Sequence, residues 1–160
     1  MLPLILRIID VNLNRVSEGL RVLEDISRFI LEDAQSSRQL KSIRHFVSQP
    51  ARKMDVPLTE FRDAEGDIGA EFDLTGSHIN LVAIVHANAR RVHEGIRVLE
   101  ELAKLPELAD VISSTELRRH RYSIYTLEKH VVSGLINQTS HNDRLEEDEI
   151  EKTKKNRKEA

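Results

Sequence analysis

Two arginines in this sequence stand where a helix would be expected to carry apolar side chains. At about 100° per residue, Arg15 and Arg91 fall on the same side of their predicted helices as the residues that should form a core. A guanidinium group facing a core needs a carboxylate partner or an anionic ligand, because an unpaired buried charge is costly. Arginine also suits two-point binding of phosphate. The pattern therefore predicts either a structural ion pair or a phosphate site.

The residues around the two arginines repeat as well. The set consists of Asn12, Arg15, Glu18 and Gly19 in the first segment and Asn88, Arg91, Glu94 and Gly95 in the second. The asparagines and glycines fall on the expected inner face, and the glutamates fall at its border. Glycine inside a helix costs about 1 kcal/mol relative to alanine. One reason for it is close packing of two helices, and the other is space for a ligand; the two are compatible.

Two further arginines show the same anomaly in later predicted helices. Arg44 lies among Leu40 and Val47, and Arg121 lies among Leu117 and Ile124. The four inward arginines and the two border glutamates could form a closed ion network. The arginines outnumber the glutamates, which favours an anion site that includes Arg44 and Arg121.

The segment 62–69 could contribute phosphate and metal ligands. Gly66 and Gly69 would allow backbone N–H groups to approach an anion closely, with Arg62 beside them. Asp63 and Asp67 could hold Mg²⁺, which favours one or two carboxylates together with phosphate oxygens. The alternative is an ordinary turn. No Walker A, Rossmann or protein-kinase motif is present.

An internal repeat organises the elements that must position these residues. The fourteen residues from Asn12 return 76 residues later from Asn88, with nine positions identical. Apolar spacing predicts helices near 4–32, 35–49, 78–105 and 114–137, and Ser113 with Glu116 is a candidate capping box for the last. We expect an all-α fold of two repeated αα-hairpins in a pseudo-twofold four-helix arrangement. The first helix would pack against the third, with a long central loop over 50–77.

Composition limits the function classes. The chain is expected to form one domain over 1–136, with repeats at about 4–49 and 78–136. The polar tail at 137–160 would be a frayed surface helix or disordered. With 0 Cys and no apolar run of about 20 residues, we expect no disulfide and no membrane span; a cytoplasmic location fits. A net charge of −3 and 4% aromatic residues without Trp argue against nucleic acid.

Four separated motifs within residues 7–130 occur in the order in which one known family carries them. They are Arg7-Ile-Ile-Asp10-x-Asn12-x-Asn14-Arg15-x-x-Glu18-Gly19, Arg62-Asp63-x-Glu65-Gly66-Asp67-x-Gly69, Ala87-Asn88-x-x-Arg91-x-x-Glu94-Gly95 and Arg118-x-x-Arg121-Tyr122-x-x-Tyr125-x-Leu-Glu128. The chain thus resembles the strictly monofunctional hydroxymethylpyrimidine-phosphate kinase family. Its members occur alone or fused to the N-terminus of thiamine-phosphate synthase, so this chain would be a stand-alone form or an excised domain.

The resemblance implies an ATP-dependent phosphorylation in thiamine biosynthesis. The substrate would be hydroxymethylpyrimidine phosphate, the product its diphosphate, and free hydroxymethylpyrimidine would not be accepted. Thiamine-phosphate synthase would be the pathway neighbour that uses the product.

The roles of individual residues rest on physical inference. Phosphoryl transfer needs charge neutralisation and positioning more than covalent chemistry. We therefore take Arg15, Arg91, Glu18 and Glu94 as the candidate catalytic set, with ATP and Mg²⁺ as the expected co-substrate and metal. Two alternatives stay open. One is a non-catalytic nucleotide- or phosphate-binding module, and the other is a structural helical protein that forms a homodimer through its glycine faces.

Overall fold

The computed structural model describes residues 2–54, 57–62 and 80–158, with side chains in the last range given through His141 and at Arg144. Across these ranges all regular structure is helical, so the all-α prediction is confirmed. The long helices are α1 (Leu2–Asp25), α2 (Ala34–Val47), α4 (Leu81–Leu102) and α5 (Ser114–Lys158). Shorter turns of helix are α3 (Gln49–Lys53), η2 (Leu58–Phe61) and η4 (Pro106–Leu108).

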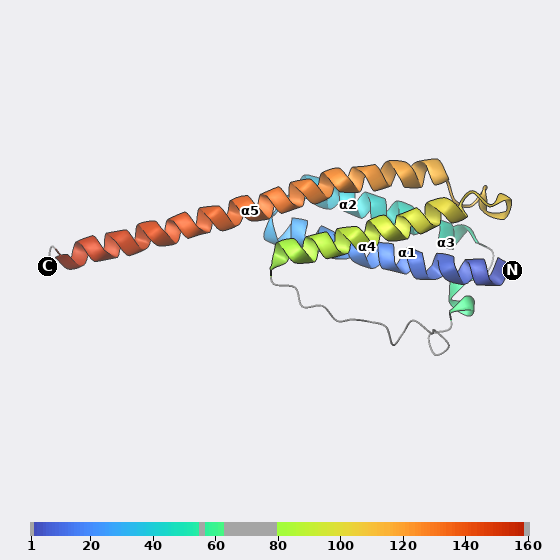
Figure 1. Cartoon of the computed structure of the whole chain (residues 1–160), viewed down its shortest axis with the longest axis horizontal. Coiled ribbons are helices and arrows are strands. Elements are labelled where there is room, and N and C mark those ends of the chain that lie inside the picture. The colour runs from blue at the N-terminus through green and yellow to red at the C-terminus, as the bar shows by residue number, and fades with distance from the viewer. Residues whose placement is uncertain (1, 55–56, 63–79, 159–160) are drawn as a thin grey trace.

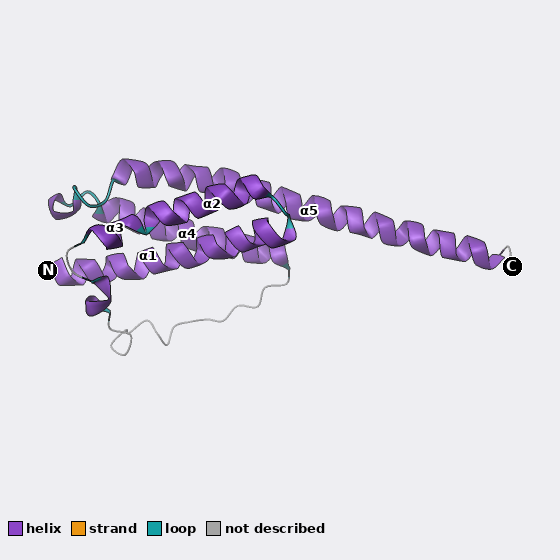
Figure 2. Cartoon of the chain, turned by 180° about the vertical axis from the view of Figure 1, so that it is seen from behind, coloured by secondary structure: helices purple, strands orange, loops and turns teal. Residues whose placement is uncertain are grey.

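The helices form two layers. Helices α1 and α4 run antiparallel and pack side by side, so the predicted contact between the first and third long helices is present (Figure 1). Helix α2 packs on α1, α5 packs on α4, and α2 and α5 also contact each other. Both lie over the same face of the α1–α4 layer (Figures 1 and 2). Of the described helices, only the short η2 lies on the opposite side, against α1, and we call this side the open face (Figure 1).

Apolar residues at helical spacing build the core between the layers. Leu20 and Leu23 of α1 and Ile96 and Leu99 of α4 are at most 1% exposed. Helix α2 contributes Leu40, Ile43 and Val47, and α5 contributes Leu117, Ile124, Leu127, Val131 and Leu135. Burial of such side chains stabilises the fold by about 1.5–3 kcal/mol each. The core therefore fixes the rotation of each helix, and with it the direction of every polar side chain.

The end of the first helix differs from its prediction, whereas the starts of α2 and α5 are capped by side chains. The first helix was predicted to continue to residue 32, but its last turn, Ile26–Ile30, is π-helical and Glu32 has φ 53°. Asp33 then caps α2 by accepting hydrogen bonds from the backbone N–H groups of Gln35 and Ser36. At α5, Ser113 Oγ accepts from the backbone N–H of Glu116 at 3.3 Å, which is one half of the predicted capping box; the Glu116 carboxylate pairs with Arg119.

Helix α5 is much longer than the others. It continues through the polar tail to Lys158 and projects away from the bundle (Figures 1 and 2). Its buried side chains end at Leu135, among the residues whose side chains are described. Among the described helices, none is both long enough and apolar enough to cross a membrane.

Candidate functional site around the helix crossing

The two repeated glycines lie where α1 and α4 approach most closely. A Cβ atom at Gly19 would lie 2.7 Å from Val92 Cγ2 and 3.0 Å from the Asn88 carbonyl oxygen. A Cβ at Gly95 would lie 2.6 Å from Val16 Cγ2 and 3.5 Å from the Asn12 carbonyl oxygen. The expectation of ligand space at these glycines is therefore wrong, because the facing helix fills it.

The repeated asparagines support the same crossing. Asn12 is buried, and its Nδ2 donates to the Ile8 carbonyl oxygen at 2.8 Å. Asn88 is half-buried, and its Nδ2 donates to the Ile84 carbonyl oxygen at 2.9 Å. Each amide group thus forms a hydrogen bond within its own helix, four residues back.

Arg15 and Arg91 do not face the core. Both are exposed, as are Glu18 and Glu94, so the prediction that the arginines point inward is wrong. The physical reason is that Asn12 and Gly19 already occupy the side of α1 that contacts α4. Arg15 lies one turn from Asn12 and is rotated toward the open face. In the described part of the chain, neither the Arg15 nor the Arg91 side chain has a hydrogen-bond or ion-pair partner.

Arg44 and Arg121 are inward-facing, as predicted, but each has an internal partner. Arg44 Nε and Nη2 bind Glu24 Oε2 at 3.0 and 2.9 Å. Arg121 Nε binds Glu100 Oε1 at 2.6 Å, and its Nη2 reaches Oε2 at 3.4 Å. This hydrogen bonding to Glu100 raises the pKa of Arg121. Both arginines are thus neutralised by carboxylates. The prediction of a phosphate site at Arg44 and Arg121 had not included these two glutamates.

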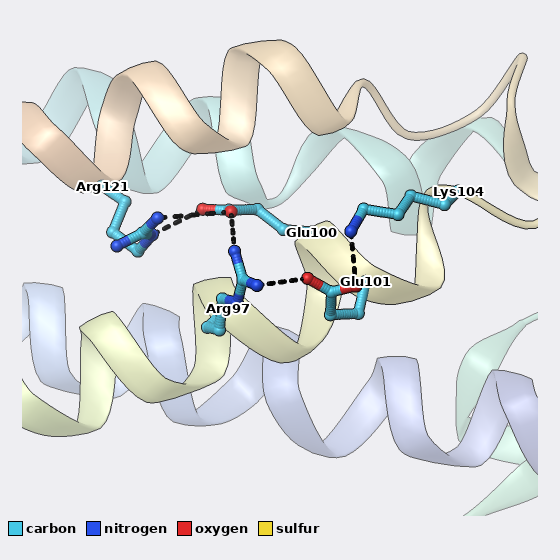
Figure 3. Close-up of polar contacts among 5 residues, drawn as sticks. All are labelled: Arg97, Glu100, Glu101, Lys104 and Arg121. Atoms are coloured by element: carbon cyan, nitrogen blue, oxygen red, sulfur yellow. Dashed lines mark hydrogen bonds and ion pairs between the residues drawn. The ribbon is translucent and has the colours of Figure 1, made fainter.

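The two glutamates are the residues that sequence reasoning missed. Glu24 is 3% exposed and Glu100 is 1% exposed, and they are equivalent in the repeat. Glu100 lies between Arg121 and Arg97, whose Nη1 approaches it at 3.2 Å, while Arg97 also pairs with the exposed Glu101 (Figure 3). The sequence did carry a signal for them, because a glutamate directly follows a core leucine at the same position in each copy of the repeat.

Arg62 also has an internal partner. Its Nε and Nη2 donate to Oδ2 and Oδ1 of Asp10 at 2.8 and 2.9 Å, and Asp10 is only 5% exposed. Hydrogen bonding to Asp10 raises the pKa of Arg62. This two-point contact holds the end of η2 against α1. The Arg62 guanidinium group, which was predicted to bind phosphate, therefore already has a carboxylate partner.

The remaining predicted loop residues, Asp63, Gly66, Asp67 and Gly69, lie outside the described residues. Within the described ranges, no group of three or more His, Asp or Glu side chains is placed to hold a metal ion.

A polar and aromatic cluster on the outer edge between α4 and α5 had not been predicted as a site. His86 Nδ1 and Glu128 Oε1 lie 2.7 Å apart, and His93 Nε2 lies 3.4 Å from Glu128 Oε2. The His93 ring stacks on Tyr125 at 3.8 Å between centroids. Burial lowers the pKa of His93, and its Nδ1 is buried without a hydrogen-bond partner.

The fold and these sites define an all-α protein in which two equivalent arginines beside a glycine crossing have no ion-pair partner among the described residues. Residues 7–130 match the model of the ThiD2 family, so the chain belongs to the ThiD2 family. No solved structure matches it significantly.

Curated relatives connect the chain with proteins of thiamine biosynthesis. A thiamine-phosphate synthase of Nostoc punctiforme is 35% identical over 144 residues, which cover 87% of this chain and 38% of the relative. The thiamine-phosphate synthase of a Synechocystis species is 37% identical, covering 82% and 36%. That of Rhodopirellula baltica is 31% identical, covering 82% and 36%. The chain therefore spans well under half the length of these relatives.

Proposed function

We propose that this chain is a kinase that transfers the terminal phosphoryl group of ATP to hydroxymethylpyrimidine phosphate. An oxygen of the substrate phosphate forms a bond to the γ-phosphorus, the bond from that phosphorus to the β-phosphate oxygen breaks, and ADP leaves. The product would be the diphosphate that thiamine-phosphate synthase consumes. The names of the relatives and the motifs in the sequence support this pathway position.

The observation that carries the proposal is the pair of exposed guanidinium groups beside the glycine crossing. Arg44, Arg62 and Arg121 are all neutralised by carboxylates, whereas Arg15 and Arg91 are exposed and, within the described residues, unpaired. Equivalent positions on two antiparallel helices related by the repeat lie on the same side of the layer. Two cations on the open face therefore suit a substrate pair that brings several phosphate groups together.

The carboxylates beside these arginines fit a Mg²⁺ ion that arrives with ATP. Mg²⁺ keeps several water ligands and needs only one or two protein carboxylates in addition to phosphate oxygens. Glu18 and Glu94 are exposed and, in the part of the chain that is described, free of ion pairs. When bound, the metal would neutralise charge on the phosphates. Glu18 and Glu94 would hold it and orient the phosphates between the arginines.

The exposed guanidinium groups would also explain selection of a phosphorylated substrate. Free hydroxymethylpyrimidine has no phosphate, so discrimination against it would come from lost attraction to these groups. The inward-facing Arg44 and Arg121 would not contribute, because each already has a carboxylate partner.

Product analysis tests the proposal directly. The purified chain is incubated with ATP, Mg²⁺ and hydroxymethylpyrimidine phosphate, and the diphosphate is measured by chromatography. Free hydroxymethylpyrimidine and a reaction without Mg²⁺ serve as controls. We expect the diphosphate only in the complete reaction. ATP binding without turnover would instead identify a non-catalytic nucleotide-binding module.

A further inference from the structure

Comparing the two repeated hairpins separates residues that the fold requires from residues that need another explanation. Features that the fold requires recur in both hairpins: the glycine crossing does, and so do the Glu24–Arg44 and Glu100–Arg121 pairs. The cluster on the outer α4–α5 edge does not recur. We call it the tyrosine face; it consists of His86, His93, Tyr122, Tyr125 and Glu128.

The first hairpin carries small or unrelated residues at the matching positions. Aligning the two hairpins on their glutamate–arginine pairs matches these five residues, in order, with Asp10, Ser17, His45, Ser48 and Ala51. None of these has an aromatic ring except His45, and the same helix packing forms without a stacked ring pair. Helix packing therefore does not account for the tyrosine face.

The tyrosine face is exposed where a ligand could reach it. Tyr122 is 61% exposed and Tyr125 is 47% exposed, with ring centroids 6.2 Å apart and planes inclined at 58°. The Arg121 guanidinium carbon lies 5.3 Å from the centre of the Tyr122 ring. These are the two tyrosines of a chain that has no tryptophan. Exposed aromatic rings of this kind bind planar heterocycles by stacking.

Polar side chains beside the two rings could orient a ligand by hydrogen bonding. Glu128 is 20% exposed, and its two oxygens face His86 and His93. A carboxylate accepts about four hydrogen bonds, so Glu128 retains capacity for a donor from a ligand. His93 stacks under Tyr125 with its Nδ1 unpaired, an arrangement that costs stability rather than adding it.

We propose that the tyrosine face is a binding site for a planar nitrogen heterocycle that carries an amino group. The ring stacks on Tyr122 and Tyr125, and the amino group donates to Glu128. The site lies on the outer edge of α4 beside α5, whereas Arg91 lies on the open face, so it is separate from the phosphate site of the proposed function. Adenine and the aminopyrimidine of the proposed substrate share this chemistry.

Tyrosine-selective NMR tests the proposal, because every tyrosine signal of this chain comes from the tyrosine face. The chain is labelled with ring-¹³C tyrosine and titrated separately with adenosine and with hydroxymethylpyrimidine, neither of which carries phosphate. Purine riboside, which lacks the amino group of adenosine, is the matched ligand control. We expect at least one amino ligand to shift both ring signals, with purine riboside binding more weakly. The two titrations identify which ring is preferred.

The variants replace residues by those that the first hairpin already accommodates. Tyr122→His with Tyr125→Ser should weaken binding, measured by calorimetry, by about tenfold or more, in line with base–aromatic stacking. Glu128→Ala should remove the preference for adenosine over purine riboside. His45→Ala in the first hairpin is the matched control and should leave affinity unchanged. Circular dichroism checks that each variant is folded.

The outcomes separate this inference from the proposed kinase. If Arg15→Gln with Arg91→Gln abolishes turnover while the ring signals still shift with an amino ligand, two separate sites are supported. Ring shifts without any turnover in the parent chain would support the tyrosine face and contradict the kinase. Turnover with no ring shift by either amino ligand would overturn the inference and leave the kinase standing. A lower sedimentation coefficient in the tyrosine variant would also overturn it, since the face would then be a contact between copies.

Discussion

Charge pairing at single residues divides the five arginines considered as site residues into two groups. Arg44, Arg62 and Arg121 each bind a carboxylate that is at most 5% exposed. These pairs join helices that are distant in sequence. Arg15 and Arg91 stay in solvent without such partners among the described residues. The first group is therefore expected to contribute to folding, and the second to ligand binding.

Replacing the exposed arginines should affect activity and spare stability. Arg15→Gln and Arg91→Gln each remove a charge-assisted contact to phosphate, so kcat/KM should fall by the equivalent of about 2–4 kcal/mol. The unfolding midpoint should not move, because no described partner is lost. Arg90→Gln, the exposed neighbour that points in another direction, should change neither quantity. Steady-state kinetics and thermal melts measure both, and normal kinetics in both variants would refute the shared phosphate site.

Replacing the buried glutamates should have the opposite effect. Glu100→Gln leaves the partly buried Arg121 without a charged partner and should destabilise the fold by about 2–4 kcal/mol. Glu101→Gln, the exposed neighbour visible beside it in Figure 3, should cost under about 1 kcal/mol. Urea unfolding compares the two. Equal free energies of unfolding for both variants would contradict a structural role for the buried pair.

His93 should make folding stability depend on pH. Burial lowers its pKa in the folded protein below the ordinary value of 6.5, so the unfolded chain binds the proton more readily. With respect to this group, the fold is most stable above pH 6.5, and its stability falls as the pH drops below that value. His93→Ser, the residue of the first hairpin, should make the free energy of unfolding less steep in pH between 7 and 5. An unchanged slope would contradict burial of the neutral ring.

The close contact between helices α1 and α4 depends on two glycines, which helix propensity alone would not favour. Alanine is favoured over glycine within a helix by about 1 kcal/mol. At Gly19 and Gly95, however, the added methyl group would overlap a valine of the facing helix. Overpacking of this kind costs about 1–3 kcal/mol, so the close contact should prevail over propensity.

We therefore expect Gly19→Ala and Gly95→Ala to lower the free energy of unfolding. Gly134→Ala is the matched control, because its new methyl group would lie 3.0 Å from the flexible end of Leu31; it should be tolerated or slightly stabilising. Val16→Ala should rescue Gly95→Ala better than Val92→Ala rescues Gly19→Ala, where the Asn88 carbonyl oxygen also lies at 3.0 Å. Denaturant melts of the double variants test this order.

The whole molecule combines a four-helix body with a projecting helix. The last buried side chain of α5 that is described is Leu135, and Gln138 Nε2 still donates to the Ile30 carbonyl oxygen at 3.2 Å. Farther along, α5 projects beyond the body (Figure 1). The body should therefore be stable without the distal part of α5.

Truncation after His141 should leave the unfolding midpoint and any kinase activity unchanged. It removes the charged part of the tail but keeps the contacts that fix α5 on α4. A further truncation before Leu135 removes a core side chain and should lower stability by about 2–5 kcal/mol. Loss of stability in the longer form would indicate that the projecting part of α5 contacts the body.

The sequence by itself determined the helical class, the repeat and the apolar face of each long helix. These follow from local spacing: Val16, Leu20 and Leu23 recur every three or four residues and must share one side of a helix. The repeat at Gly19 and Gly95 likewise indicated the crossing, because an interior glycine is unfavourable without a close neighbour.

Only the tertiary structure decided where the polar residues at the edge of each apolar face point. A difference of one turn separates Asn12, which is buried against α4, from Arg15, which is in solvent. Arg44 binds Glu24 because α2 lies against the edge of α1 that carries this glutamate. Such pairings depend on which helices are neighbours, and helical periodicity carries no information on that choice.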